Sequence, residues 1–193
     1  IESWKAKKEF ARERFEERFR EGKEALAYLN ISEDYVCCLG FPDAGTHRYI
    51  KEMEIDIEAL MKRFRPKRVY THCIEGGHND HDVVSYVVKR VCQKLSFTNV
   101  YEWTEYYSGQ PMGTENVSFR TRMKTSKVEV ITLTSEERDL KRKMLACHRS
   151  QDVEQYYMQG EATRKAHLEN MDEEMYEFTQ ISSEGIVNLR HIS

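Results

Sequence analysis

Short apolar runs alternate with amphipathic helical runs along this chain, and this alternation limits the folds open to it more than any other feature. Apolar side chains recur at helical spacing over residues 5–29, 50–64 and 83–91. Strand-like runs cover residues 35–41, 68–73, 100–103 and 128–133. Strands that alternate with helices at short intervals favour a parallel sheet covered by helices. We therefore predict an α/β fold of Rossmann-like type, with a mostly parallel sheet and helices on both faces.

The run Tyr35–Phe41 is continuously apolar and ends at Pro42, which predicts a buried strand with Cys37 and Cys38 in the core. The chain has five cysteines, an odd number, and none of them forms a C-x-x-C pair. Scattered cysteines fit a reducing compartment better than a disulfide framework. We therefore predict a cytoplasmic location.

The later part of the chain contains one clear helix signal. Thr134 with Glu137 three residues later is a capping box, which predicts a helix over residues 135–148. The polar stretch 108–118 contains glycine and proline and predicts a surface loop. The Glu-, Met- and Tyr-rich sequence beyond Gln151 predicts further helix to about residue 177.

Composition excludes several classes of protein. The chain has 193 residues, 39% of them apolar, which suits one α/β domain over residues 1–193. Lys plus Arg is 30 and Asp plus Glu is 33, so the net charge of −3 argues against a nucleic-acid scaffold. No apolar run approaches the roughly 20 residues that span a bilayer, so we predict no membrane span in this segment.

Three of the seven histidines fall in the window Thr71–Asp82, between a predicted strand and a predicted helix. In a parallel sheet this is the carboxyl end of a strand, where ligands bind. His78, Asp80 and His81 place two potential metal ligands and a carboxylate within four residues. The same residues could instead form an ordinary helix start with solvated histidines. Spacing alone leaves both interpretations open, and a zinc site would need further ligands from elsewhere.

Several motifs, in order, resemble the PIG-L/LmbE-like zinc-dependent N-deacetylases. Gly77–His81 resembles the family's His-Pro-Asp-His motif, with Asn79 in place of the proline. The other landmarks are Arg18-Phe19-Arg20-Glu21 before Leu29-Asn30-Ile31, Leu39-Gly40-Phe41-Pro42-Asp43, Arg65-Pro66-Lys67-Arg68-Val69, and Lys143 through His148-Arg149-Ser150-Gln151. Each motif alone is weak, but the series covers residues 18–151.

The resemblance implies roles for individual residues. His81 would be a zinc ligand, His78 would stabilise the oxyanion of the tetrahedral intermediate, and Asp80 would orient or tune a histidine. Arg18 and Asp43 would line the substrate pocket. Two residues that flank the motif are also notable: Glu75 is a candidate for substrate binding, whereas we predict His72 to be a buried, hydrogen-bonded side chain.

One family motif is absent from the sequence. The family's first motif, Ala-His-Pro-Asp-Asp-Glu, supplies two zinc ligands and the general base, and no His-x-Asp-Asp precedes Arg18. We therefore expect the N-terminal strand and helix portion of the fold, roughly 30 residues or more, to be absent from this chain. We also expect the chain by itself to hold metal poorly and to be inactive, while the parent protein is an enzyme.

The resemblance implies a metal-dependent hydrolase, with Zn²⁺ or another divalent metal such as Fe²⁺, that removes the acetyl group from an N-acetylglucosamine-type amino sugar or glycoconjugate. Two alternatives stay open: an amidase of a thiol conjugate or antibiotic precursor on the same fold, and a non-catalytic binding module without a complete metal site. No nucleotide cofactor is implied. Assembly into a homo-oligomer also stays open.

Overall fold

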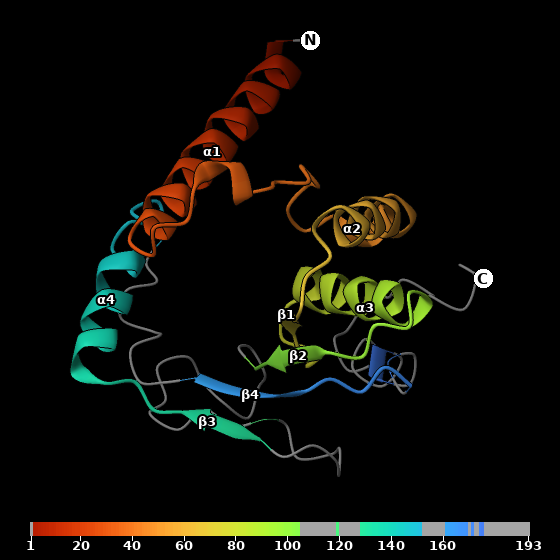
Figure 1. The fold of residues 1–193 in the computed structure, drawn as a ribbon. Coiled ribbons are helices and arrows are strands. Elements are labelled where there is room, and N and C mark those ends of the chain that lie inside the picture. The colour runs from red at the N-terminus through yellow and green to blue at the C-terminus, as the bar shows by residue number, and fades with distance from the viewer. Residues whose placement is uncertain are drawn as a thin grey trace. The chain divides into compact units, whose positions relative to one another are not determined.

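The computed structural model describes residues 2–104, 119, 128–151, 161–169, 171 and 174–175. In chain order, the elements are α1 (Glu2–Ala27), η1 (Glu33–Tyr35), η2 (Thr46–Arg48), α2 (Ile50–Phe64), β1 (Val69–His72), α3 (Asn79–Lys94), β2 (Val100–Trp103), β3 (Glu129–Ile131), α4 (Ser135–Leu145) and β4 (Glu161–Lys165) (Figure 1). Within the described residues, no helix is long and apolar enough to cross a membrane.

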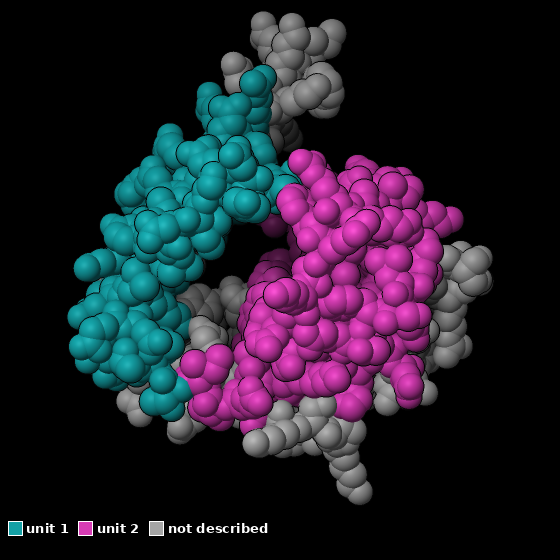
Figure 2. Space-filling model, viewed as in Figure 1, with its two compact units in different colours: residues 1–38, 132–159 teal, residues 39–131, 160–193 magenta. Residues whose placement is uncertain are grey.

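The chain divides into two compact units, each formed from two separate stretches of sequence. Unit 1 comprises residues 1–38 and 132–159, and unit 2 comprises residues 39–131 and 160–193 (Figure 2). The single domain over residues 1–193 therefore stays a prediction.

Unit 1 contains α1 and α4, which pack against each other. The predicted capping box opens α4: Thr134 Oγ1 accepts the Glu137 N–H at 3.2 Å, and the Thr134 N–H donates to Glu137 Oε2 at 2.8 Å. The buried carboxylate of Glu21 on α1 accepts two hydrogen bonds from Ser150, from its backbone N–H at 2.8 Å and from its Oγ at 2.7 Å. These contacts tie α1 to the segment that follows α4.

Unit 2 contains a four-stranded sheet in the order β1-β2-β4-β3. β1 and β2 are parallel, with Val69 opposite Val100 and His72 opposite Trp103. β4 runs antiparallel to both β2 and β3. The α/β class is confirmed. The sheet is mixed, and among the described strands the parallel pairing is limited to β1 and β2.

α3 packs on β1 and α2 packs on α3, as Figure 1 shows. The apolar periodicity of the two helices explains this packing, because buried side chains of both helices belong to one apolar cluster. That cluster consists of Ile50, Met53, Ile74, Val83, Tyr86, Val87, Val91, Met171 and Met175. The predicted boundaries of α2 are confirmed. α2 ends at Phe64, and its C-cap residue Arg65, just before Pro66, has a left-handed φ of 45°.

Two predicted elements are wrong. Tyr35–Phe41 is not a strand: the 3-10 turn η1 ends at Tyr35, which is 72% exposed, and Cys37 and Cys38 are exposed rather than in the core. A strand needs a neighbour for its backbone hydrogen bonds, and the described sheet pairs none with this run. Glu161–Lys165, predicted as helix, is β4, since it pairs on both sides with β2 and β3. The predicted loop over residues 108–118 lies outside the described residues.

Candidate functional site

The candidate site lies where β1 ends and α3 begins. The intervening loop turns at Gly76, which has a φ of +76°, a conformation that favours glycine. Asp82, in the first turn of α3, fixes this loop: its Oδ1 accepts the Glu75 N–H at 2.9 Å and its Oδ2 accepts the Gly76 N–H at 3.0 Å. The Ser85 hydroxyl donates to the backbone carbonyl of His72 at 2.5 Å. The start of α3 therefore holds both the end of β1 and the loop that follows.

Three imidazole rings form a row at this end of β1. The ring centroids of His72 and His81 are 4.1 Å apart, and those of His78 and His81 are 4.5 Å apart. Trp103 of the neighbouring strand lies against the His72 ring, with centroids 4.6 Å apart. His72 is half-buried and lies between the His81 and Trp103 rings, so the prediction that its side chain is buried is wrong. The row brings together His78 and His81, which the sequence had selected, and adds His72 and Trp103.

Asp80 connects the start of α3 to the turn that contains Asp43. Its Oδ2 accepts the Ala44 N–H at 2.6 Å, and its Oδ1 accepts the Thr46 N–H at 3.2 Å and the Thr46 hydroxyl at 2.5 Å. Burial raises the pKa of Asp80, but these hydrogen bonds and the nearby His78 outweigh that effect, and the net pKa is lowered. The electrostatic coupling to His78 is compatible with the predicted tuning role of Asp80, which stays a prediction.

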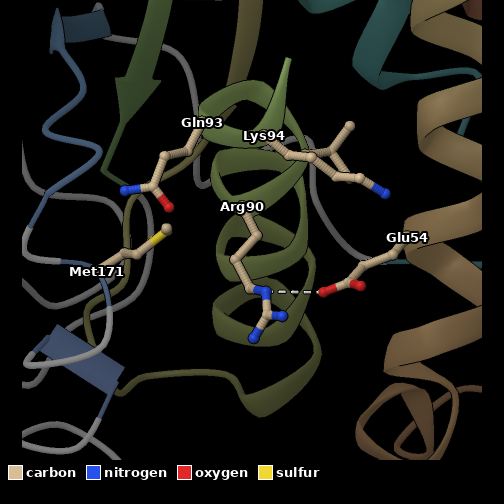
Figure 3. A pocket seen from close by; sticks show the side chains of 6 residues that line it. Glu54, Arg90, Gln93, Lys94 and Met171 are labelled. Atoms are coloured by element: carbon tan, nitrogen blue, oxygen red, sulfur yellow. Dashed lines mark ion pairs between the residues drawn. The ribbon is translucent and has the colours of Figure 1, made fainter. Parts of the chain in front are cut away.

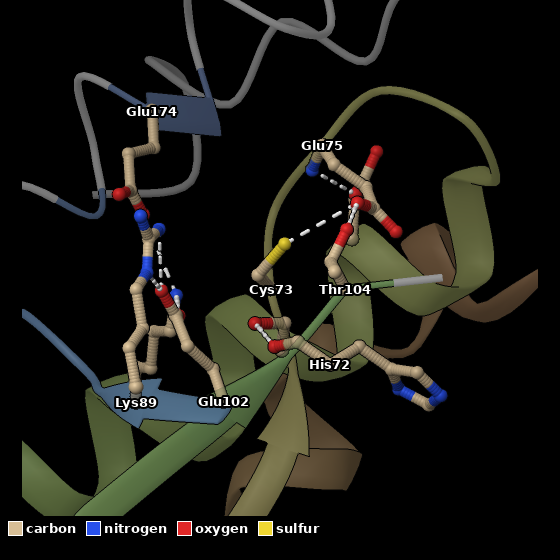
Figure 4. A network of polar contacts seen from close by, with 10 residues as sticks. His72, Cys73, Glu75, Lys89, Glu102, Thr104 and Glu174 are labelled. Atoms are coloured by element: carbon tan, nitrogen blue, oxygen red, sulfur yellow. Dashed lines mark hydrogen bonds and ion pairs between the residues drawn. The ribbon is translucent and has the colours of Figure 1, made fainter. Parts of the chain in front are cut away.

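The side chain of Glu75 is directed into a buried polar group rather than into solvent. Glu75 is 3% exposed, and its Oε2 accepts the Thr104 hydroxyl at 2.6 Å and the Cys73 thiol at 3.4 Å (Figure 4). Burial, followed by the charge of Glu75, raises the pKa of the Cys73 thiol well above its usual value, so this sulfur is an inert thiol. The role of Glu75 in substrate binding stays a prediction.

A second buried group of charges lies on the α3 side of the sheet, also drawn in Figure 4. Lys89 Nζ is 2.5 Å from Glu102 Oε2 and 3.4 Å from Glu174 Oε2. Arg164 on β4 contacts Glu102 at 2.6 Å and lies over the ring of Phe119, 4.4 Å from its centroid. Burial lowers the pKa of Lys89, but the two carboxylates outweigh it and the net shift is upward. Lys89 is therefore a buried ammonium held by its partners.

Two predicted site residues, Arg18 and Asp43, lie outside the segment between β1 and α3 in the sequence. Arg18 is half-buried on α1 in unit 1, and Asp43 is exposed in the turn before η2 in unit 2. Both stay predictions as substrate-binding residues. A cavity of about 430 Å³ on unit 2 involves none of the predicted residues (Figure 3). Its two cations, Arg90 and Lys94, are paired with Glu54 at 2.8 Å and Glu58 at 2.6 Å.

The predicted zinc ion fits the described residues only in part. A catalytic zinc takes three protein ligands and keeps one open position. Half-buried His81 offers one imidazole beside the other two rings, but the described residues contain no group of three or more His, Cys, Asp or Glu that could hold a metal ion. Asp80 and Asp82 are engaged by backbone N–H groups. The described residues therefore do not form a complete set of zinc ligands, and His81 as a zinc ligand stays a prediction.

The raised pKa of Asp82 predicts a specific pH dependence of stability. Burial raises it to about 6, above the ordinary value of 3.8. Between these pH values the folded protein keeps a proton that the unfolded chain has lost, so raising the pH favours unfolding. In metal-free buffer, we expect the unfolding free energy of the wild type, relative to Asp82→Asn, to fall by about 2 kcal/mol from pH 4 to pH 6. Urea unfolding across this range tests it, and a difference that stays flat or rises would contradict it.

The part of the chain that contains the histidine row is similar to a known protein family. Residues 2–92 match the family model described as PIG-L, GlcNAc-PI de-N-acetylase. No curated protein sequence matches the chain. A triple mutant of a deacetylase of the teicoplanin biosynthetic pathway is 20% identical, with a TM-score of 0.56 over 75% of this chain and 68% of that chain. The zinc-inhibited form of teicoplanin deacetylase Orf2 is 16% identical, with a TM-score of 0.53 over 75% of this chain and 71% of that chain.

At these identities the likeness to the two solved structures establishes the fold, and the family match rests on residues 2–92, which include the histidine motif. The predicted relationship is thereby confirmed as a similarity: residues 2–92 match the PIG-L family model, and the chain has the fold of the two deacetylase structures.

Proposed function

We propose that this chain forms part of a hydrolase that removes the acetyl group from an N-acetylglucosamine-type amino sugar, free or in a glycoconjugate, and that the reaction requires zinc or another divalent metal such as Fe²⁺. The observation that carries the proposal is the row of His72, His81 and His78 at the carboxyl end of β1, inside a PIG-L family segment. We place the protein in the cytoplasm. The proposed reaction allows assembly into a homo-oligomer.

In the proposed reaction, a water molecule gives up a proton and its oxygen bonds to the amide carbonyl carbon. The carbon–nitrogen bond breaks, and the sugar nitrogen takes that proton to become an amine. The acid that forms leaves as acetate and releases its own proton to solvent. A bound divalent metal would polarise the carbonyl and lower the pKa of the attacking water. We assign His81 to it as a ligand.

His78 is suited to the carbonyl oxygen. It is exposed in the N-cap position of α3, where its side chain makes no capping hydrogen bond. A helix N-terminus favours negative charge, and Asp80 lies close enough to interact with His78 electrostatically. A donor aimed at the oxygen that becomes negative stabilises the transition state by about 3 kcal/mol. We assign that donor to the His78 ring.

An acylated antibiotic precursor is the second candidate substrate class. It is supported by the two solved structures of similar fold, which are described as a deacetylase of the teicoplanin biosynthetic pathway and as teicoplanin deacetylase. Parallel assays with an N-acetylglucosaminide, a thiol conjugate and an acylated glycopeptide precursor separate the candidates by their relative kcat/KM.

The test of the proposed function is acetate release together with metal analysis on the full-length protein. We expect acetate release from an N-acetylglucosaminide to be removed by EDTA, and His81→Ala to lose both the bound metal and the activity, since metal affinity depends on each ligand. His167→Ala is the matched control, because His167 is a half-buried histidine of unit 2 outside the motif. Full metal content and activity in His81→Ala would overturn the proposal.

A further inference from the structure

The turn that carries Asp43 is closed tightly and holds one residue in a costly conformation. The Gly45 N–H donates to the carbonyl of Pro42 at 3.1 Å, and a Cβ at Gly45 would lie 3.0 Å from Pro42 Cγ, so only glycine fits without a shift. Ala44 has a φ of +55°, in the left-handed region, which costs a residue with a Cβ about 1 kcal/mol. Strain of this kind persists only where its surroundings enforce it, and it concentrates at functional sites.

The carboxylate of Asp80 holds Ala44 in this conformation. It accepts a hydrogen bond from the Ala44 N–H at 2.6 Å. It also accepts hydrogen bonds from the Thr46 N–H at 3.2 Å and from the Thr46 hydroxyl at 2.5 Å. Asp80 is 9% exposed and Thr46 is 7% exposed, so these bonds form where water competes little. Both oxygens of Asp80 are therefore used to hold the turn. The Thr46 side chain bonds directly to Asp80, and nothing in its sequence context marks it as a site residue.

We propose that Thr46 and Asp80 are positioning residues that hold the turn 42–46 in its strained form and thereby place Asp43 for binding the hydroxyl groups of the amino sugar. This rests on the proposed function for the identity of the sugar. A carboxylate accepts hydrogen bonds from sugar hydroxyls, and its affinity depends on how little it must be ordered on binding. Because Ala44 adjoins Asp43, fixing the N–H of Ala44 fixes the backbone from which Asp43 projects.

The experiment measures binding rather than turnover. The probe is N-acetylglucosamine, titrated into the full-length protein and followed by NMR chemical shifts. We expect Thr46→Val, which keeps the shape but removes the hydroxyl donor, to weaken binding by about tenfold, which is the scale of one lost hydrogen bond. Thr46→Ser keeps the donor and is expected to bind within about twofold of the wild type. A Thr46→Val protein that binds as the wild type does would overturn the proposal.

A double-mutant cycle separates positioning from general damage. If Thr46 acts through Asp43, Thr46→Val should weaken binding in the wild type but add almost nothing in an Asp43→Ala background. Equal effects in both backgrounds would overturn the proposal, as would a wild type that does not bind the sugar.

The two proposals fail in different ways. A wild type that binds the sugar with the predicted dependence on Thr46, but releases no acetate, would refute the proposed function and support the positioning of Asp43. Acetate release with binding that is indifferent to Thr46→Val would refute the positioning alone.

Discussion

Replacing Lys89 with methionine is expected to lower the free energy of unfolding by about 3–5 kcal/mol, the usual cost of removing one partner from a buried ion pair. Lys89 is 0% exposed, and its ammonium contacts Glu102 at 2.5 Å and Glu174 at 3.4 Å. Methionine fills much of the same space but removes the ammonium that pairs with Glu174. Glu102 keeps its ion pair with Arg164. Urea unfolding followed by circular dichroism measures the loss.

A matched control lies on the same helix. Lys94 also has a short contact to a carboxylate, 2.6 Å to Glu58, but its side chain is 65% exposed. Lys94→Met should therefore cost at most about 1 kcal/mol. If Lys89→Met cost as little as Lys94→Met, the buried network would not stabilise the fold as we describe. Adding Glu174→Gln to Lys89→Met should recover part of the loss, because burial already raises the pKa of Glu174 and its charge would then be gone.

Replacing His78 with alanine is expected to lower kcat for acetate release by about 100- to 1,000-fold while bound metal stays unchanged. The reason is that His78 is assigned to the carbonyl oxygen and His81 to the metal. Because the His78 side chain makes no capping hydrogen bond to α3, its removal should leave the helix intact. Kinetic assays combined with metal analysis and thermal unfolding of the same preparation measure the three quantities.

Two further variants separate the role of His78 from that of His81. His78→Gln retains a side-chain donor and should recover part of the activity, whereas His81→Ala should lose metal and activity together. Loss of metal in His78→Ala, in proportion to its loss of activity, would show that the two histidines share one role. That result would contradict the assignment of His78 to the oxyanion.

Parts of the fold that depend on local signals could be predicted from the sequence. The periodic apolar positions and the Arg65-Pro66 break gave α2 its boundaries, and the Thr134–Glu137 pair gave the start of α4. Strands depend on partners distant in sequence, so apolar character alone misled the prediction for 35–41. The polar segment 161–165 is a strand because two other strands flank it, which no local pattern records.

In the candidate site too, residues close together in the sequence could be predicted, whereas residues brought together by the fold could not. His78, Asp80 and His81 are crowded into four residues, so their spacing marked them as candidates, and the resemblance to the deacetylase family gave them their roles. Thr46 is 34 residues from Asp80, and its hydroxyl looks like that of any other threonine until the fold brings the two together. The Lys89 network likewise draws on segments far apart in the chain, and charged residues on a helix are ordinarily predicted to face solvent.

Asp80 and Asp82 give the first turn of α3 two attachments, one to the turn at 44–46 and the other to the loop at 75–76. Successive helical residues are rotated by about 100°. Inserting a single amino acid between these carboxylates would swing one of them out of reach of its amides, so evolution can vary the neighbouring side chains here far more readily than the spacing.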